Sequence, residues 1–344
     1  MINESRPFPQ YEIRFLGVGD ADCIIIRYKR DAVSPDSVAV VDAGNVSDAG
    51  KIKDYLTKNC RANCIDLAVC THPDGDHKGG FFGLLQDDDI IIREFWLKDP
   101  AAHVSDEDFA KMKRIESKLA ACRRAYNHPT DDSLNLIDMI LEKKNTDGSI
   151  CKGVNVCPGT QHKYMPLSVL GPDDGYYQNV ALEIVQKFAE IKSEPDTEEY
   201  DEKFEVSEEE AASIIDQAHD ESPMNKGSIV LYFAPTSRFK IILAGDATET
   251  SLGMVVKSNK DIVNSVLKVP HHGSKHNLNS VLIDELKPSA SIISAAGTKE
   301  HPHAALVRYL SKYGNVYSTH KSGDLWYSDL PPAIGATPLK EKVL

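Results

Sequence analysis

The chain has 344 residues, of which 41% are hydrophobic and 26% charged, with a formal charge of −13 at pH 7. This balance is ordinary for a globular protein with a full core, and no apolar run approaches the roughly 18 residues that a membrane span needs. Residues 1–10 lack the apolar core of a signal peptide, so we expect a cytoplasmic protein without a membrane segment.

The N-terminal part of the chain alternates short apolar runs with turns that contain glycine. We expect strands at 11–15, 23–28 and 38–41, a helix over 46–59 and a further strand at 65–70. Strands followed by a helix and another strand indicate a layered α/β fold. The last of these strands runs directly into residues 71–80, THPDGDHKGG, which hold two histidines and two aspartates.

The middle of the chain is predicted to be largely helical. We expect a helix that starts at 81–85, a strand at 94–97 and a long helix over 105–126, which Ser105 and Asp108 would cap. Lys and Arg on the polar side of that helix could contact a phosphate backbone, although a solvated helix face is the more frequent origin of such a pattern. A second helix is expected over 133–143.

An acidic segment follows the strand that we expect at 165–170. Residues 173–223 are helix-prone, and residues 194–221 hold thirteen Asp or Glu and one Lys, which is nearly all of the net negative charge of the chain. A solvated or mobile insertion is the simpler interpretation, and a docking surface for a protein partner is the alternative. Because the charge is local, the overall balance neither favours nor excludes a nucleic acid as substrate.

The C-terminal part repeats one pattern. Strands are expected at 228–234, 239–244, 266–270 and 291–294, and the last three are followed by Gly-Asp at 245–246, His-His-Gly-Ser at 271–274 and His-Pro-His at 301–303. Together with the motif at 71–80, four strands each deliver His or Asp at one end. Imidazole and carboxylate are donors that zinc and manganese accept, so the sequence predicts a metal site at these strand ends.

The number of donors is sufficient for two metal ions. Such a pair needs about three or four protein ligands for each ion, and one carboxylate often bridges them. Two divalent ions would bring the pKa of a bridging water close to neutrality, which is the chemistry of hydrolysis. The predicted metal ligands are His72, Asp74, Asp76, His77, Asp246 and His271.

The motifs together resemble those of the metallo-β-lactamase superfamily. They are VDAG at 41–44, THPDGDHKGG, GD at 245–246, PHHGS at 270–274 and HPH at 301–303. Within the superfamily, GVGDADCIII at 17–26 and NKGSIVLYF at 225–233 resemble the β-lactamase-like domain of the ComEC competence proteins and its soluble relatives. The likeness covers most of residues 11–328, with 99–164 and 173–223 outside it.

This resemblance implies a single αββα sandwich over residues 1–344, with a helical insertion at about 99–164 and a helical, acidic insertion at 173–223. It also implies two divalent metal ions and hydrolysis of phosphodiesters, with DNA or RNA as candidate substrates. It assigns ligand roles to four residues: His72, Asp76, His77 and Asp246.

The chain departs from the superfamily pattern at two places. Asp74 stands where most of the superfamily has a histidine, and the harder oxygen donor fits manganese as well as zinc. The usual histidine of the third motif is missing near Asn225, so His271 or His272 could complete the first metal site.

We therefore predict a binuclear metal-dependent phosphodiesterase or nuclease. Asp76, His77 and a bridging Asp246 would hold the nucleophile. His272 or His301 would steady phosphoryl oxygens or protonate the leaving group. Two alternatives stay open: hydrolysis of a lactone, thioester or amide on the same fold, and a metal-binding protein without enzymatic activity that docks a partner through 194–221. Substrate contacts are predicted for four residues, of which the first two could instead cap the following strand: Asn225, Ser228, Ser274 and His303.

Overall fold

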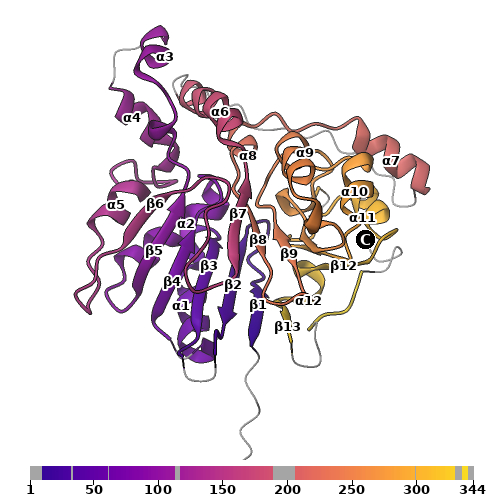
Figure 1. The fold of residues 1–344 in the computed structure, drawn as a ribbon, viewed down its shortest axis with the longest axis horizontal. Coiled ribbons are helices and arrows are strands. Elements are labelled where there is room, and N and C mark those ends of the chain that lie inside the picture. Colours follow the sequence, from indigo (N-terminus) through magenta and orange to yellow (C-terminus); the bar gives the residue numbers. More distant parts are fainter. Residues whose placement is uncertain are drawn as a thin grey trace, which may run out of the picture.

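The computed structural model describes residues 10–31, 34–60, 62–112, 117–188, 206–298, 300–329 and 335–339. Within these residues the strands form two sheets (Figure 1), one of seven strands in the order β13-β1-β2-β3-β4-β5-β6 and one of six in the order β12-β11-β10-β9-β8-β7. Both sheets are mixed, because each joins antiparallel strands to a run of parallel ones.

The first sheet contains the strand that precedes the 71–80 motif. The strands β3, β4, β5 and β6 run parallel, so their carboxyl ends lie along one edge of the sheet. The bounds are β1 (Tyr11–Phe15), β2 (Cys23–Tyr28), β3 (Ser37–Ala43), β4 (Cys64–Val69), β5 (Ile91–Leu97), β6 (Lys152–Asn155) and β13 (Leu325–Ser328).

The second sheet contains the strands that precede the other predicted motifs. Here β9, β10, β11 and β12 run parallel, whereas β7, β8 and β9 pair in antiparallel fashion. The bounds are β7 (Leu167–Gly171), β8 (Val230–Phe233), β9 (Ile241–Leu243), β10 (Val266–Lys268), β11 (Ala290–Ile293) and β12 (Asn315–Ser318).

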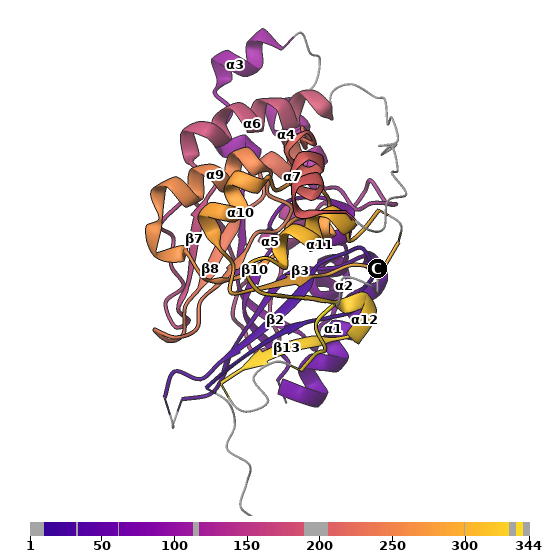
Figure 2. The same cartoon turned by 90° about the vertical axis from the view of Figure 1, so that its right-hand side faces the viewer.

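The two sheets face each other and helices cover both outer sides, which confirms the predicted αββα sandwich. The central core joins residues of both sheets, among them Ile13, Val41 and Leu231. Figure 2 shows α9 and α10 on one side of the strands and α1 and α2 on the other. The helices that pack on the first sheet are α1 (Ala49–Tyr55), α2 (Gly75–Gln86), α5 (Leu136–Glu142) and α6 (Asp174–Lys187), and those on the second are α7 (Glu208–Asp216), α9 (Glu249–Ser258), α10 (Ser280–Leu286) and α11 (Ala304–Leu310).

The prediction of one long helix over 105–126 is wrong. The structure has two short helices there, α3 (Asp106–Lys111) and α4 (Lys118–Arg123). In Figure 1, α3 stands away from the sandwich, whereas α4 buries Ala121 and Cys122 against the core of the first sheet. Ser105 caps α3 as expected. Ser117 has an extended backbone and caps α4, so a separate helix begins there. Residues 113–116 lie outside the described part of the chain.

The basic side chains of these two helices are paired with acidic ones. Lys111 lies 3.0 Å from Asp108, and Lys118 lies 2.9 Å from Asp106. Arg123 is likewise paired with Asp138, on α5. This pairing favours the solvated helix face over a phosphate-binding surface, because each cation already has a carboxylate beside it.

The described part of the acidic segment packs on the helices that cover the second sheet. Residues 189–205 lie outside the described residues, so the expectation for 194–205 has no structural outcome. In α7, however, Ala211 and Ile215 are fully buried against the helices of the second sheet. Asp216 accepts hydrogen bonds from the backbone and hydroxyl of Ser280, at 2.7 and 2.8 Å. Residues 206–216 therefore pack through one apolar face, while acidic side chains such as Glu209 and Glu210 stay exposed.

No helix among the described residues is both long enough and apolar enough to cross a membrane.

Candidate metal centre

The predicted ligands meet where the carboxyl ends of the parallel strands of both sheets come together. Asp42 is the penultimate residue of β3, and the 71–80 motif follows β4. From the second sheet, Asp246 follows β9, while His271 and His272 follow β10. Because parallel strands place their carboxyl ends on one edge, loops far apart in the sequence can share one site.

The helix after β4 begins earlier than the sequence predicts. It starts at Gly75 rather than near 81, so Asp76 and His77 lie in its first turn. The motif's glycines explain how the helix reaches the sheet. A Cβ at Gly80 would lie 2.2 Å from the carbonyl oxygen of Ala43, so only glycine allows the helix to approach the end of β3 this closely.

Four side chains form one compact donor group: Asp76, His77, Asp246 and His272, whose donor atoms all lie within 4.8 Å of one another. Nε2 of His77 lies 3.4 Å from Oδ2 of Asp76 and 3.3 Å from Oδ2 of Asp246. Nε2 of His272 lies 3.0 Å from Oδ2 of Asp76 and 3.9 Å from Oδ2 of Asp246. Two imidazoles and two carboxylates at such spacing fit one divalent cation.

A second group of donors adjoins the first through Asp246. Nε2 of His72 lies 3.6 Å from Oδ2 of Asp74 and 3.8 Å from Oδ2 of Asp246. The rings of His72 and His77 are 4.1 Å apart, so the two groups are neighbours. Asp246 therefore occupies the position that a bridging carboxylate would take between two metal ions.

Two of these nitrogens are buried without a hydrogen-bond partner. Nε2 of His72 and Nε2 of His77 have no such partner among the described residues, and both side chains are fully enclosed. An unsatisfied buried polar atom costs about 1–3 kcal/mol. A bound cation would remove that cost, so this arrangement fits a metal-binding role for both histidines.

The opposite ring nitrogens show which tautomer these histidines adopt. Nδ1 of His77 lies 2.8 Å from Oδ2 of Asp42, and Nδ1 of His272 lies 3.0 Å from the carbonyl oxygen of Ser294. Both partners only accept, so both Nδ1 atoms carry the proton and donate it. Each imidazole therefore directs the lone pair of Nε2 to the shared centre.

His72 follows the same logic through Thr71. The Thr71 hydroxyl donates to Oδ2 of Asp42 at 2.7 Å, so its oxygen accepts from Nδ1 of His72 at 3.1 Å. Asp42 thus orients two of the candidate ligands at once. It was part of the VDAG motif, but the sequence alone did not assign it a role.

The carboxylates and imidazoles shift each other's pKa strongly. Burial alone would lower the pKa of His77, but the carboxylates of Asp246, Asp76 and Asp42 raise it well above its ordinary value. Burial would likewise raise the pKa of Asp76, yet the charges of His77 and His272 hold it well below its usual range. The cluster therefore favours a positive charge at its centre, and binding of a metal ion to these donors would release protons.

Beneath the centre lies a buried ion pair that the sequence reasoning missed. Nζ of Lys268, in β10, lies 2.5 Å from Oδ2 of Asp22, and both side chains are almost completely enclosed. Oδ1 of the same carboxylate lies 3.8 Å from Nδ1 of His272. A lysine inside an otherwise apolar strand was the available signal, since a buried charge requires a partner.

His271 is placed differently from its neighbour. Its Nδ1 lies 3.0 Å from Oδ1 of Asn277 and 3.4 Å from Oδ2 of Asp220, and its side chain is 27% exposed. Its backbone N–H donates to Oδ1 of Asp246 at 3.2 Å. The structure thus groups His272, predicted as catalytic, with the candidate ligands, and leaves His271, predicted as a ligand, at the more open side.

His301 lies beside this open side, whereas His303 serves as a helix cap. The ring of His301 is 5.5 Å from that of His271 and 5.9 Å from that of His272. His303 caps α11, where its Nδ1 accepts from the backbone N–H of Ala305 at 3.3 Å. The structure therefore places His301 beside His271 and His272, while Nδ1 of His303 is used within the helix cap.

The remaining predicted substrate contacts are buried and bonded within the protein. The Ser228 hydroxyl accepts from the backbone N–H of Asp246 at 3.0 Å, and the Ser274 hydroxyl accepts from that of His276 at 3.3 Å. The amide of Asn225 donates to Oδ2 of Asp220 at 2.7 Å. These contacts favour a supporting role over direct contact with a substrate.

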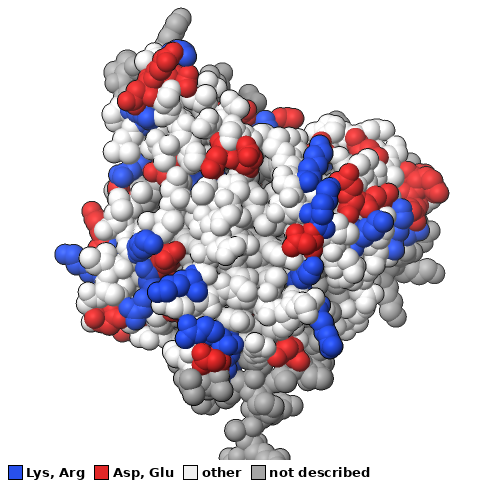
Figure 3. Space-filling view, viewed as in Figure 1, with Lys and Arg blue, Asp and Glu red and all other residues white. Residues whose placement is uncertain are grey.

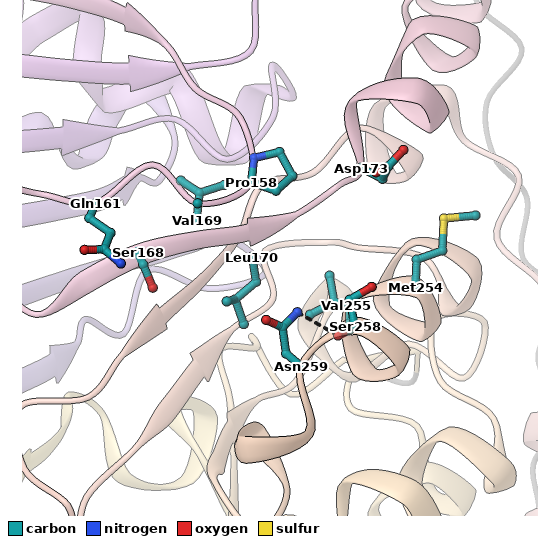
Figure 4. Close-up of a pocket in the computed structure, with 11 residues that line it drawn as sticks. Pro158, Gln161, Ser168, Val169, Leu170, Asp173, Met254, Val255, Ser258 and Asn259 are labelled. Atoms are coloured by element: carbon teal, nitrogen blue, oxygen red, sulfur yellow. Dashed lines mark hydrogen bonds between the residues drawn. The ribbon is translucent and has the colours of Figure 1, made fainter.

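A separate cavity of about 410 Å³ lies between β7 and α9. In Figure 4, Val169 and Leu170 line it from the strand, while Met254, Val255 and Ser258 line it from the helix. Its lining contains no histidine, so it does not offer the donors of the metal centre. On the face shown in Figure 3, charges of both signs surround a broad uncharged area, and acidic side chains gather over α7.

The αββα sandwich and the His and Asp residues at its strand ends resemble the metallo-β-lactamase superfamily. No family model matches the chain. Over 114 residues, which are 32% of the chain, it is 32% identical to ComE operon protein 3 of Bacillus subtilis (strain 168), and the matched region spans 15% of that protein's length.

Three solved structures are similar in outline. Igni18, a metallo hydrolase from Ignicoccus hospitalis, has a TM-score of 0.44 at 10% identity, over 93% of this chain and 100% of that one. The Rm3 metallo-β-lactamase has a TM-score of 0.35 at 14% identity, over 87% and 90%. A long-form RNase Z from yeast has a TM-score of 0.36 at 11% identity, over 85% and 38%.

Proposed function

We propose that the chain is a metal-dependent hydrolase with a two-metal centre that cleaves phosphodiesters. The observation that carries this proposal is the pair of buried, unpartnered Nε2 atoms of His72 and His77, which face a set of carboxylates. We treat residues 1–344 as one domain, because the two sheets share a core and both supply donors.

His72 and Asp74 would hold the proposed first metal ion, Asp76, His77 and His272 would hold the second, and Asp246 lies close enough to serve both. Divalent cations held there would supply Lewis acid chemistry to a hydrolytic reaction. The mixture of imidazole and carboxylate donors fits zinc or manganese.

The residues of the open side would contact the substrate. The rings of His271 and His301 lie together beside the ligand His272, and two imidazoles in that position can donate hydrogen bonds to phosphoryl oxygens. Asp42 and Ser294 would hold the ligand histidines in place while this occurs.

The choice of a phosphodiester rests on the motifs that resemble the ComEC group and on the 114-residue match to ComE operon protein 3. A nucleic acid is therefore the proposed substrate class.

The test combines metal content with turnover. Purified protein is assayed for bound zinc and manganese by mass spectrometry, then with bis(p-nitrophenyl) phosphate, single-stranded DNA and RNA. We expect Asp76→Asn to lose about 100-fold or more of the phosphodiesterase activity, because it removes a ligand charge. Asp87→Asn is the matched control, since Asp87 lies at the opposite end of α2, beside Lys53.

Other outcomes would contradict the proposal in different ways. Fewer than one metal ion per chain, or equal activity of wild type and Asp76→Asn, would remove the two-metal hydrolase altogether. Turnover of lactones, thioesters or amides alone would keep the fold and change the bond. Bound metal without any turnover would favour a protein that uses its metal site for binding.

A further inference from the structure

Asn225 is a buried side chain in the segment before β8. It lies in α8 (Pro223–Lys226) and is 3% exposed. The chain just after it is tied to both halves of the centre, because Ile229 N–H donates to the carbonyl oxygen of Thr71 at 2.9 Å and Ser228 accepts from the N–H of Asp246. Asn225 is thus held beside the loops that carry His72 and Asp246.

The orientation of the Asn225 amide is fixed by Asp220. Nδ2 donates to Oδ2 of Asp220 at 2.7 Å. Asp220 also accepts from the backbone N–H of Ser222 at 2.8 Å and lies 3.4 Å from Nδ1 of His271, so its carboxylate is held in place as the acceptor. An amide whose nitrogen faces a carboxylate must direct its oxygen away from it.

That oxygen has no hydrogen-bond partner. Oδ1 of Asn225 is buried, and no donor among the described residues reaches it. Other buried side-chain atoms around the centre also lack a partner among the described residues, namely Nε2 of His72, Nε2 of His77 and Oδ1 of Asp22. Buried carbonyl oxygens are nearly always satisfied in folded proteins, so Oδ1 of Asn225 is open to a partner from outside the chain.

The two proposed metal sites differ in their number of donors. The second has three donors of its own besides Asp246: Asp76, His77 and His272. The first has His72 and Asp74 near Asp246, which is one donor fewer. An amide oxygen is an accepted ligand for divalent cations that favour oxygen.

We propose that Oδ1 of Asn225 is a ligand of the first metal ion, together with His72, Asp74 and Asp246, and that Asp220 is the residue that positions it. This inference rests on the proposed two-metal centre. It gives the acidic segment a defined part in the site, because Asp220 comes from that segment. Asp220 also accepts from Nδ2 of Asn277 at 2.7 Å, and the same nitrogen donates to the carbonyl oxygen of Asp246 at 3.1 Å.

The assignment predicts different metal preferences for the two sites. The first would have one imidazole and three oxygen donors, whereas the second would have two imidazoles and two carboxylates. Because oxygen donors suit manganese and imidazole suits zinc, we expect Mn²⁺ to compete best at the first site.

The test measures metal binding rather than turnover. Metal-free wild type, Asn225→Ala and Asn145→Ala are titrated with Mn²⁺ and with Zn²⁺ by calorimetry, and metal per chain is counted after dialysis. Asn145 is the matched control, since it is equally buried but bonds the backbone of Ile92 through both its amide atoms. We expect Asn225→Ala to weaken the metal affinity of one site by more than about tenfold and to leave that of the other unchanged. Asn145→Ala should leave both affinities unchanged.

A second measurement uses the wild type, so that it does not depend on a variant that folds. In protein labelled with ¹⁵N asparagine, the assigned side-chain amide of Asn225 should shift when Zn²⁺ fills the first site, while that of Asn145 should not. Asp220→Asn should weaken the same site by about 10- to 100-fold, because it releases the amide.

The outcomes separate the two proposals. A wild type that binds fewer than two metal ions contradicts the two-metal centre itself. A wild type that binds two, with unchanged affinities in Asn225→Ala or an unshifted Asn225 amide, leaves the centre intact and overturns the role of Asn225.

Discussion

The metal centre has two halves that are built in different ways. The half on the first sheet comes from one stretch of ten residues after β4, and a single helix start, at Gly75, aims Asp76 and His77. The half on the second sheet comes from the ends of separate strands, where Asp246 and His272 depend on distant partners such as Ser228 and Ser294. A continuous motif is therefore readable from sequence, whereas a site assembled from several strand ends needs the structure to assign its members.

The largest effect should come from Asp246, the residue that we propose both metal ions share. Asp246→Ala removes the proposed bridging carboxylate, so we expect it to lower the content of both metal ions and to reduce turnover by about 1,000-fold or more. Metal content and kcat are measured together, with Asp261→Ala as a control because Asp261 lies in the turn after α9. Loss of only one metal ion would show that the two proposed metal sites do not share Asp246.

The adjacent histidines of the second half should behave differently. His272→Ala should lose one metal ion and about 100-fold in activity, since Nε2 of His272 faces Asp76 and Asp246. His271→Ala should keep both ions and lose about tenfold, as expected of a side chain at the open side. Loss of a metal ion in His271→Ala but not in His272→Ala would support the prediction from the sequence, in which His271 is the ligand and His272 is catalytic.

Asp42 tests how the first half is supported. Asp42→Asn weakens the acceptor that fixes His77 and, through Thr71, His72. We expect metal affinity to fall by about 10- to 100-fold, which calorimetry would measure. Asp66→Asn is a suitable control, because Asp66 accepts from the backbone of Val38 away from the centre. Unchanged affinity would mean that the histidines are held by packing alone.

The smallest effect should be on the stability of the metal-free protein. The pKa of His77 is raised above its ordinary 6.5, so its contribution to stability is complete below that pH and is lost as the pH rises. The pKa values of Asp76 and Asp246 are lowered from 3.8, so their contribution is present above that pH and is lost as the pH falls.

Thermal unfolding in EDTA should therefore show a maximum between these two pH values. His77→Gln should flatten the decline on the alkaline side, and added Zn²⁺ should remove it, because the ion replaces the proton. A wild-type unfolding temperature that rises steadily from pH 6.5 to 9 would contradict this account.

Strands with strong apolar patterning were predictable from the sequence. The expected strands at 11–15 and 23–28 match β1 and β2, because alternating or continuous apolar residues have few other stable arrangements. The strand β6 was missed, since Lys-Gly-Val-Asn has little strand propensity and pairs only through β5.

Local patterns failed where distant contacts decide the outcome. The choice between His271 and His272 depends on their positive φ angles of 48° and 53°, which turn the two side chains to different partners. Asp220 and Asn277, which hold His271, lie far from each other in the sequence. Neither the backbone conformation nor these contacts can be read from a pair of adjacent histidines.

The most direct test of the central claim is an anomalous diffraction experiment on crystals grown with Mn²⁺. We predict two peaks about 3.5–4 Å apart, one beside His72 and Asp74 and the other beside Asp76, His77 and His272, with Asp246 between them. A single peak, or a second ion held by His271 in place of His272, would contradict the account.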